Sequence, residues 1–223
     1  MTWVKICGIT NLEDAQLAVE AGADAVGFVF YDKSPRKIDP DAAREIAARL
    51  PQKVEKVGVF ASRSVGDVQQ FVEQVGLTAI QFYPTSEFEA VAELIALKKK
   101  RTELKLIVVC PADKLSQKGL LMSEELRKVL YALMFDSGTG AQPGGTGNRF
   151  NWNEARGMLQ VMSVTVPVIV AGGLNPLNVA EAINLFQPYG VDVASGVEAK
   201  PGKKDPKKVR AFVRAVREAE RNS

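Results

Sequence analysis

Short apolar runs alternate with longer segments of mixed polarity along the whole of this 223-residue chain. The runs are rich in Val, Ile and Phe, which is typical of strands buried on both faces of a parallel sheet. Eight strands are predicted, at Trp3–Ile6, Ala25–Phe30, Val54–Phe60, Thr78–Phe82, Leu104–Val109, Leu130–Phe135, Val166–Ala171 and Val191–Ala194. Apolar residues between the strands recur at helical spacing, as in Val65, Val68, Val72 and Val75 and in Val209, Phe212, Val213 and Val216.

The ends of several helices carry their own signals. Capping-box spacing occurs twice, in Thr10 with Glu13 and in Ser86 with Glu89. A glycine precedes a predicted strand at three places, where it would cap a helix in the left-handed conformation: Gly22, Gly76 and Gly190.

Eight strand–helix units favour an α/β fold of the (β/α)8 barrel type, with residues 1–223 as a single catalytic domain. An open doubly wound sheet would carry its glycine fingerprint after the first strand. Here the glycines gather after strands six to eight, which favours the closed barrel. Two long connections, Tyr31–Pro40 and Ser137–Asn151, follow strands at the end where barrel enzymes bind their ligands.

Glycine-rich turns follow the last three predicted strands. Glycine lets the backbone approach a ligand closely and aim its N–H groups at an anion. Turns after strands seven and eight form the usual phosphate site of such barrels, which predicts a phosphorylated small-molecule substrate. The candidate binding residues are Gly172, Gly173, Ser195 and Gly196, with Gly145 as a further member.

Composition excludes several other classes. The chain has 29 Lys and Arg against 26 Asp and Glu, a net charge too small and too scattered to indicate nucleic-acid binding. There is no histidine, no CxxC and no apolar run of membrane-spanning length, so we expect no metal site and no membrane partner. A soluble cytoplasmic protein is expected. Its densest basic segment, Lys200 to Arg210, is interpreted as a solvated loop and helical turn, with an anion-binding patch as the alternative.

Without histidine, acid–base chemistry must use other side chains. Cys7 ends the first strand and is expected to face the barrel mouth, where a thiolate is a competent base if nearby positive charge, such as Lys5, lowers its pKa. Asp136 ends the sixth strand, expected across the ring from the first, and is a candidate general acid. The structural alternatives are a small buried hydrophobe for Cys7 and a loop cap for Asp136.

Arg36 lies in the loop after the second strand, where Pro35 would stiffen the backbone. Arginine is the natural bidentate partner of a carboxylate, so Arg36 is a candidate carboxylate anchor. An ordinary surface arginine is the alternative.

Taken together, several segments resemble phosphoribosylanthranilate isomerase, the barrel enzyme family of tryptophan biosynthesis. The similarity covers nearly the whole chain in order. The segments that carry it include 5–10, 22–24, 27–30, 34–36, 57–60, 135–137, 144–147, 171–174, 195–198 and 201–205.

The resemblance implies an Amadori rearrangement of N-(5-phosphoribosyl)anthranilate that needs no cofactor. By that similarity Asp136 is the general acid, Cys7 is the general base and Arg36 holds the anthranilate carboxylate. Asp192 is expected to contact a substrate hydroxyl, and the turns after strands seven and eight to hold the phosphate. The oligomeric state is expected to be a monomer or a homodimer.

The chain departs from the family pattern at a few positions. Tyr83 stands where the family usually has histidine, segment 139–143 is additional, and Asn148 and Asn151 replace common Lys and Asp. Two other functions remain open: an isomerase of the histidine pathway, and a non-catalytic barrel that binds a phosphorylated metabolite. Cys7 and the absence of a Gly-Gly turn after strand three or four disfavour the former.

Overall fold

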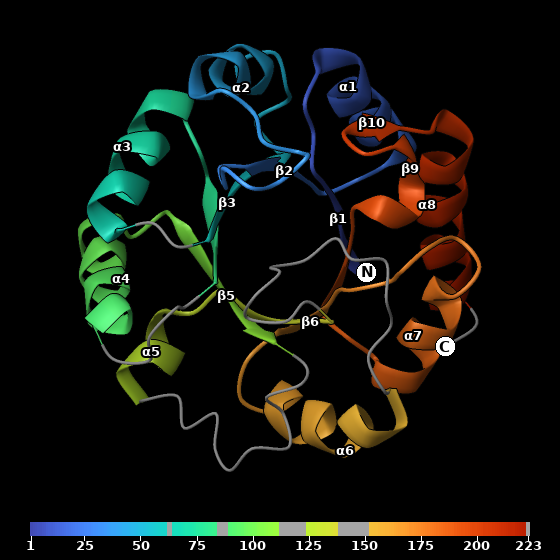
Figure 1. Ribbon diagram of the computed structural model, residues 1–223. Helices are drawn as coiled ribbons and strands as arrows, with labels where there is room; N and C mark the ends of the chain where they lie inside the picture. Colours follow the sequence, from blue (N-terminus) through green and yellow to red (C-terminus); the bar gives the residue numbers. More distant parts are fainter. Residues whose placement is uncertain (62–63, 84–88, 112–123, 138–151, 222–223) are drawn as a thin grey trace.

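Eight parallel strands close into a barrel in sequence order (Figure 1). The computed structural model describes residues 1–61, 64–83, 89–111, 124–137 and 152–221. The barrel strands are β1 (Trp3–Cys7), β2 (Ala25–Val29), β3 (Glu55–Ala61), β4 (Ala79–Tyr83), β5 (Lys105–Pro111), β6 (Ala132–Asp136), β7 (Val168–Val170) and β8 (Gly190–Val193). The predicted fold class is therefore confirmed.

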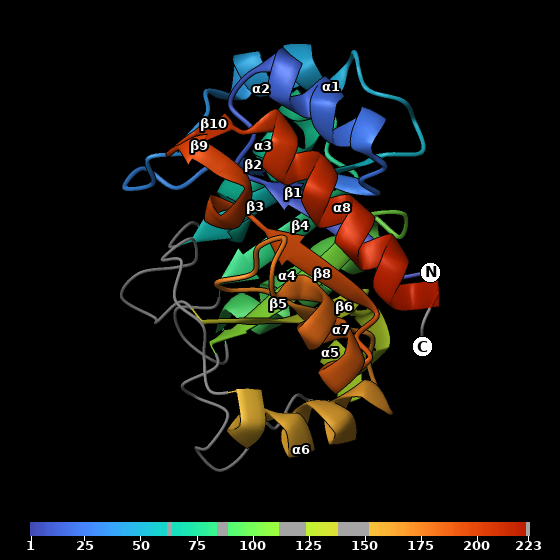
Figure 2. The same ribbon diagram turned by 90° about the vertical axis from the view of Figure 1, so that its right-hand side faces the viewer.

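Helices surround the barrel as an outer layer (Figure 1). They are α1 (Leu12–Ala21), α2 (Pro40–Ala47), α3 (Val65–Val75), α4 (Glu89–Lys100), α5 (Glu124–Val129), α6 (Trp152–Ser163), α7 (Val179–Phe186) and α8 (Pro206–Arg221). After β8 the chain forms a 3-10 turn, η2 (Ser195–Val197), and a hairpin of β9 (Glu198–Lys200) and β10 (Lys203–Lys204). Figure 2 shows this hairpin on the side of the barrel away from both termini.

Alternation along the strands creates two cores. In β1, Val4 and Ile6 pack outward against the helix layer, whereas Trp3 and Cys7 belong to clusters inside the barrel. Because side chains alternate with a period of two, Lys5 also points inward, where it is fully buried. The inward side chains at the carboxyl ends of the strands therefore reach the barrel mouth together.

The predicted helix faces are confirmed, since the four valines of α3 and the apolar stripe of α8 are buried. Burial of such stripes supplies most of the stability of a helix in a folded protein. Each predicted strand is present, and its ends differ from the prediction by at most two residues. Within the described residues, no helix is long and apolar enough to cross a membrane.

Some predicted helix ends are wrong. Gly22 and Gly76 do cap α1 and α3 in the left-handed conformation, at φ of 98° and 73°. Gly190 instead begins β8, and Gln187 caps α7. Glycine is needed at 190 because a Cβ there would lie 2.9 Å from the carbonyl oxygen of Trp3. Asn11 caps α1 in place of Thr10, whose hydroxyl donates to the carbonyl of Gly202. The second predicted capping box includes Ser86, outside the described residues.

Candidate active site

Cys7 and Lys5 point inward from β1, against a glycine of β2. A Cβ on Gly27 would lie 2.8 Å from Cys7 Sγ and 2.9 Å from Lys5 Cε, so only glycine leaves room for both side chains. Lys5 Nζ donates a 2.8 Å hydrogen bond to Asp192 Oδ1 in β8. Burial alone would lower the pKa of Lys5, but Asp192 and Cys7 outweigh it and raise that pKa, so the ammonium stays charged.

A Cys7 thiolate is a competent base if nearby positive charge lowers the pKa of the thiol, but in this structure that pKa is raised. Burial of the thiol raises its pKa and is the largest effect, while Lys5 acts in the opposite direction. Asp192 accounts for part of the difference, because it neutralises Lys5 and itself raises the pKa of Cys7. Lys5 is nonetheless the cation placed to stabilise a thiolate when one forms.

Asp136 ends β6 and is buried, as its predicted position requires. The predicted placement directly across the ring is wrong: β7 and β8 alone separate β6 from β1 on one side of the closed barrel. This shorter arc brings the two candidate acid–base groups nearer to the same side of the mouth.

Tyr83, at the end of β4, donates a 2.8 Å hydrogen bond from its hydroxyl to Asp136 Oδ2. Burial raises the pKa of Tyr83 well above its ordinary value, and the charge of Asp136 raises it further. Tyr83 therefore remains a protonated donor. Tyr83 also packs against the cluster of Cys7, Val29 and Val59, so the candidate acid and the candidate base share one space at the barrel mouth.

Arg36 reaches this space from the loop after β2. Its aliphatic stem lies on Gly8, where a Cβ would come 2.6 Å from Arg36 Cδ, and the alternative of an exposed surface arginine is wrong because the residue is 8% exposed. The guanidinium binds Glu198 in a bidentate ion pair, with Nε to Oε1 at 2.9 Å and Nη2 to Oε2 at 2.8 Å. Hydrogen bonding to Glu198 is the main reason that the pKa of Arg36 is raised.

The turns after β7 and β8 pack directly against one another. Gly172 and Gly173 adopt positive φ angles of 82° and 67°, which other residues rarely tolerate. A Cβ on Gly196 would lie 1.9 Å from the carbonyl oxygen of Leu174, in the turn after β7. Backbone conformation therefore requires glycine at 172 and 173, and the close approach of the two turns requires it at 196.

These turns present backbone amides with no acceptor. Within the described residues, the N–H groups of Gly172, Gly173, Ser195 and Gly196 donate no hydrogen bond. Unpaired amides that converge in a turn after parallel strands suit an anion. Gly145, the further predicted member, lies outside the described residues.

Sequence reasoning missed two residues at the site. The sequence distinguishes Tyr83 only as a departure from the family pattern, and nothing in segment 195–198 indicates a role for Glu198. The basic segment from Lys200 to Arg210 is mostly exposed and enters the first turn of α8, as predicted. Lys204 is the exception, because it is buried and its Nζ lies 3.0 Å from Glu198 Oε1. No group of potential metal ligands occurs among the residues that the structure describes.

Comparison with known proteins points to one family. The family described as N-(5'phosphoribosyl)anthranilate (PRA) isomerase matches residues 4–215. An N-(5'-phosphoribosyl)anthranilate isomerase of Geotalea uraniireducens is 43% identical over 217 residues, covering 97% of this chain and 99% of that relative.

Solved structures agree with the sequence comparison. The phosphoribosyl anthranilate isomerase of Thermotoga maritima is 35% identical with a TM-score of 0.79, covering 98% of this chain and 100% of that one. A second structure is of such an isomerase in complex with reduced 1-(o-carboxyphenylamino)-1-deoxyribulose 5-phosphate. It is 34% identical with a TM-score of 0.77 and has the same coverage.

Proposed function

The chain belongs to the N-(5'-phosphoribosyl)anthranilate isomerase family, and from that premise we propose which of its residues carry the reaction. The activity is an Amadori rearrangement in tryptophan biosynthesis, which converts N-(5-phosphoribosyl)anthranilate to 1-(2-carboxyphenylamino)-1-deoxyribulose 5-phosphate. It is an isomerisation, so one proton is added and another removed. A general acid and a general base are the groups to identify.

Asp136 is the general acid. It protonates the furanose ring oxygen, and the ring opens to a Schiff base at C1′. The Tyr83 hydroxyl donates a hydrogen bond to Oδ2 of Asp136, and the carboxyl group of Asp136 supplies the proton to the ring oxygen. When the proton has moved, the same hydrogen bond stabilises the resulting carboxylate.

Cys7 is the general base. Its thiolate removes the proton from C2′ to give an enolamine, which tautomerises to the ketone. Because burial raises the pKa of Cys7, the thiolate depends on a nearby cation, and the buried, charged Lys5 supplies it. Asp192 contacts a substrate hydroxyl in this proposal, and its hydrogen bond from Lys5 at 2.8 Å fixes its position.

Binding of the substrate uses its two anionic ends. Arg36 holds the anthranilate carboxylate beside β1, and the amides of Gly172, Gly173, Ser195 and Gly196 hold the phosphate. Gly145 is retained as a further phosphate ligand. Arg36 and the turns after β7 and β8 follow the carboxyl ends of their strands, where barrel enzymes bind their substrates.

The oligomeric state and the cellular location are part of the same proposal. All assigned groups come from one chain, so a monomer or a homodimer suffices, and light scattering would measure which forms. We place the enzyme in the cytoplasm, with residues 1–223 as one catalytic domain and a phosphorylated small molecule as its ligand.

The observation that carries the assignment is that Tyr83 donates a hydrogen bond to Asp136 and also packs against the cluster that contains Cys7. Titration calorimetry with the reduced product tests binding, and turnover of N-(5-phosphoribosyl)anthranilate tests the reaction. A non-catalytic barrel would bind without turnover. An isomerase of the histidine pathway would turn over its own bis-phosphate substrate in preference.

A further inference from the structure

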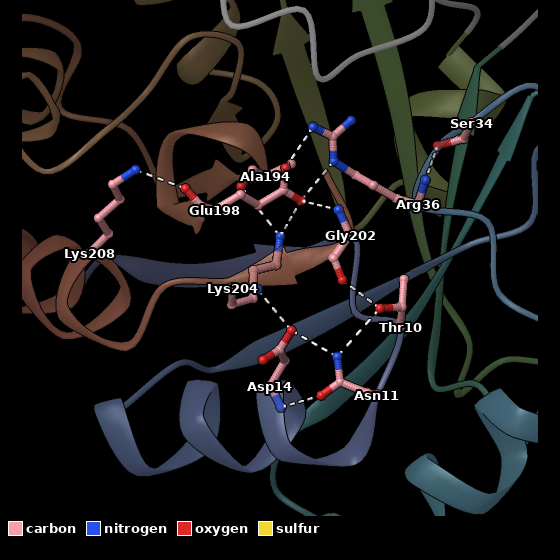
Figure 3. Close-up of polar contacts among 10 residues, drawn as sticks. All are labelled: Thr10, Asn11, Asp14, Ser34, Arg36, Ala194, Glu198, Gly202, Lys204 and Lys208. Carbon is pink, nitrogen blue, oxygen red and sulfur yellow. Dashed lines mark hydrogen bonds and ion pairs between the residues drawn. The ribbon is translucent and has the colours of Figure 1, made fainter. Parts of the chain in front are cut away.

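Arg36 belongs to a buried group of three charged side chains, and the other two have no part in the reaction steps above. We call this group, which consists of Arg36, Glu198 and Lys204, the charge cluster. Glu198 begins β9 and Lys204 ends β10, so the hairpin after the phosphate turn carries both residues (Figure 3). Glu198 is 6% exposed and Lys204 is 1% exposed, and charged side chains are rarely buried to this extent.

The first observation concerns the edges of the guanidinium. Arginine can bind a carboxylate through Nε with Nη2, or through Nη1 with Nη2. Glu198 occupies the first edge, at 2.9 and 2.8 Å. Figure 3 shows the remaining nitrogen directed away from Glu198, and Nη1 has no hydrogen bond within the part of the chain that the structure describes. The second edge is thus presented in a fixed orientation.

Glu198 itself is held from several sides. Its Oε1 also accepts from Lys204 Nζ at 3.0 Å and from the Gly202 amide at 3.3 Å. Burial by itself raises the pKa of Glu198, but the hydrogen bonds and charges of Arg36 and Lys204 outweigh it and lower that pKa. The carboxylate is therefore ionised and unable to rotate away from Arg36.

The second observation is the charge balance. Burial lowers the pKa of Lys204, and the charge of Glu198 opposes that effect. With Arg36 and Lys204 protonated and Glu198 ionised, the charge cluster has a net charge of +1. A bound carboxylate would make it neutral. Without Lys204, the pair of Arg36 and Glu198 would already be neutral and would attract a carboxylate weakly.

We propose that Glu198 and Lys204 are positioning residues that make Arg36 selective for a carboxylate on the aromatic ring of the substrate. Glu198 fixes which edge of the guanidinium is presented, and Lys204 preserves the net positive charge. The inference rests on the proposed role of Arg36 and adds the residues through which that role is exerted. A purely structural role, in which the charge cluster only holds the β9–β10 hairpin, is the alternative.

The test compares two ligands that differ only in the carboxylate. Titration calorimetry measures the dissociation constants of the reduced product and of the matched anilino sugar phosphate without the carboxylate. In the unaltered protein the carboxylated ligand binds more tightly. Lys204→Met reduces this preference about tenfold, as expected for the loss of one nearby charge in a partly screened site. A hairpin role would weaken both ligands equally and leave the preference unchanged, which would overturn the inference.

Two control variants distinguish loss of the Lys204 charge from general damage to the hairpin. Lys204→Arg keeps the charge and retains the preference. Lys203→Met alters the neighbouring lysine, which pairs with Glu13 and Asp14 instead of Glu198, and also retains it. Loss of the preference in Lys203→Met would show a general hairpin effect and contradict the role of Lys204.

A variant of Glu198 separates orientation from charge. Glu198→Gln removes a negative charge, so charge alone predicts tighter binding of the carboxylated ligand. Loss of the fixed edge predicts weaker binding, by severalfold, and this is the expected result; tighter binding would overturn the orienting role. If the unaltered protein bound neither ligand, the proposed function itself would fail, which is a distinct outcome from an unchanged preference in the variants.

Discussion

Gly196→Ala is expected to disable the phosphate site while leaving the barrel folded. The added Cβ would lie 1.9 Å from the carbonyl oxygen of Leu174, whereas real Cβ contacts are longer than 3.0 Å. Because the opposing atom belongs to the backbone, one turn must move by roughly 1 Å, a displacement that can cost about 10²-fold in catalysis. We therefore expect kcat/KM to fall by about 10²-fold and stabilisation by inorganic phosphate to be lost.

The assay measures kcat/KM together with the midpoint of thermal unfolding, with and without phosphate. Gly157→Ala is the matched control, because a Cβ there meets nothing within 4 Å in α6. That variant should keep its activity and gain up to about 1 kcal/mol of stability from the higher helix propensity of alanine. Activity of Gly196→Ala within threefold of the unaltered protein would refute the reasoning.

Three further predictions concern side chains. Tyr83→Phe should lower kcat about tenfold at unchanged KM, because the charged form of Asp136 loses a hydrogen bond. Tyr83→His should retain more activity than Tyr83→Phe. Equal rates for the unaltered protein and both variants would contradict this prediction. Arg36→Met should mainly raise KM, and a defect confined to kcat would contradict the carboxylate anchor. The lowered pKa of Glu198 implies stability that is present above its ordinary pKa and lost as pH falls through the folded value. Between about pH 5 and pH 3, the free energy of unfolding should therefore fall more for the unaltered protein than for Glu198→Gln, as measured by denaturant unfolding.

The barrel could be predicted because its determinants are local. Apolar runs and the valine stripe of α3 report burial directly, and the cap glycines Gly22 and Gly76 follow from backbone conformation. The prediction for Gly190 was wrong because glycine is needed there for close packing against Trp3, near the other end of the chain. Local sequence cannot distinguish these two reasons for glycine.

Long-range ion pairs were not predictable. Lys5 and Asp192 are 187 residues apart, and Arg36 and Glu198 are 162 apart, so no spacing rule connects them. Lys204 was misjudged for a related reason: neighbouring lysines suggested a solvated segment, whereas Glu198 draws its side chain into the protein. The pKa of Cys7 likewise depends on how burial and Asp192 offset Lys5, which only the folded arrangement reveals.

The central claim is that Cys7 and Asp136 are the base and the acid of the isomerisation. The most direct measurement follows, by fluorescence, the consumption of freshly prepared N-(5-phosphoribosyl)anthranilate by the unaltered protein, Cys7→Ala and Asp136→Asn. We predict turnover by the unaltered protein and a loss of about 10²–10⁴-fold in each variant, with binding of the reduced product preserved. Turnover by either variant within a few-fold of the unaltered protein would contradict the account.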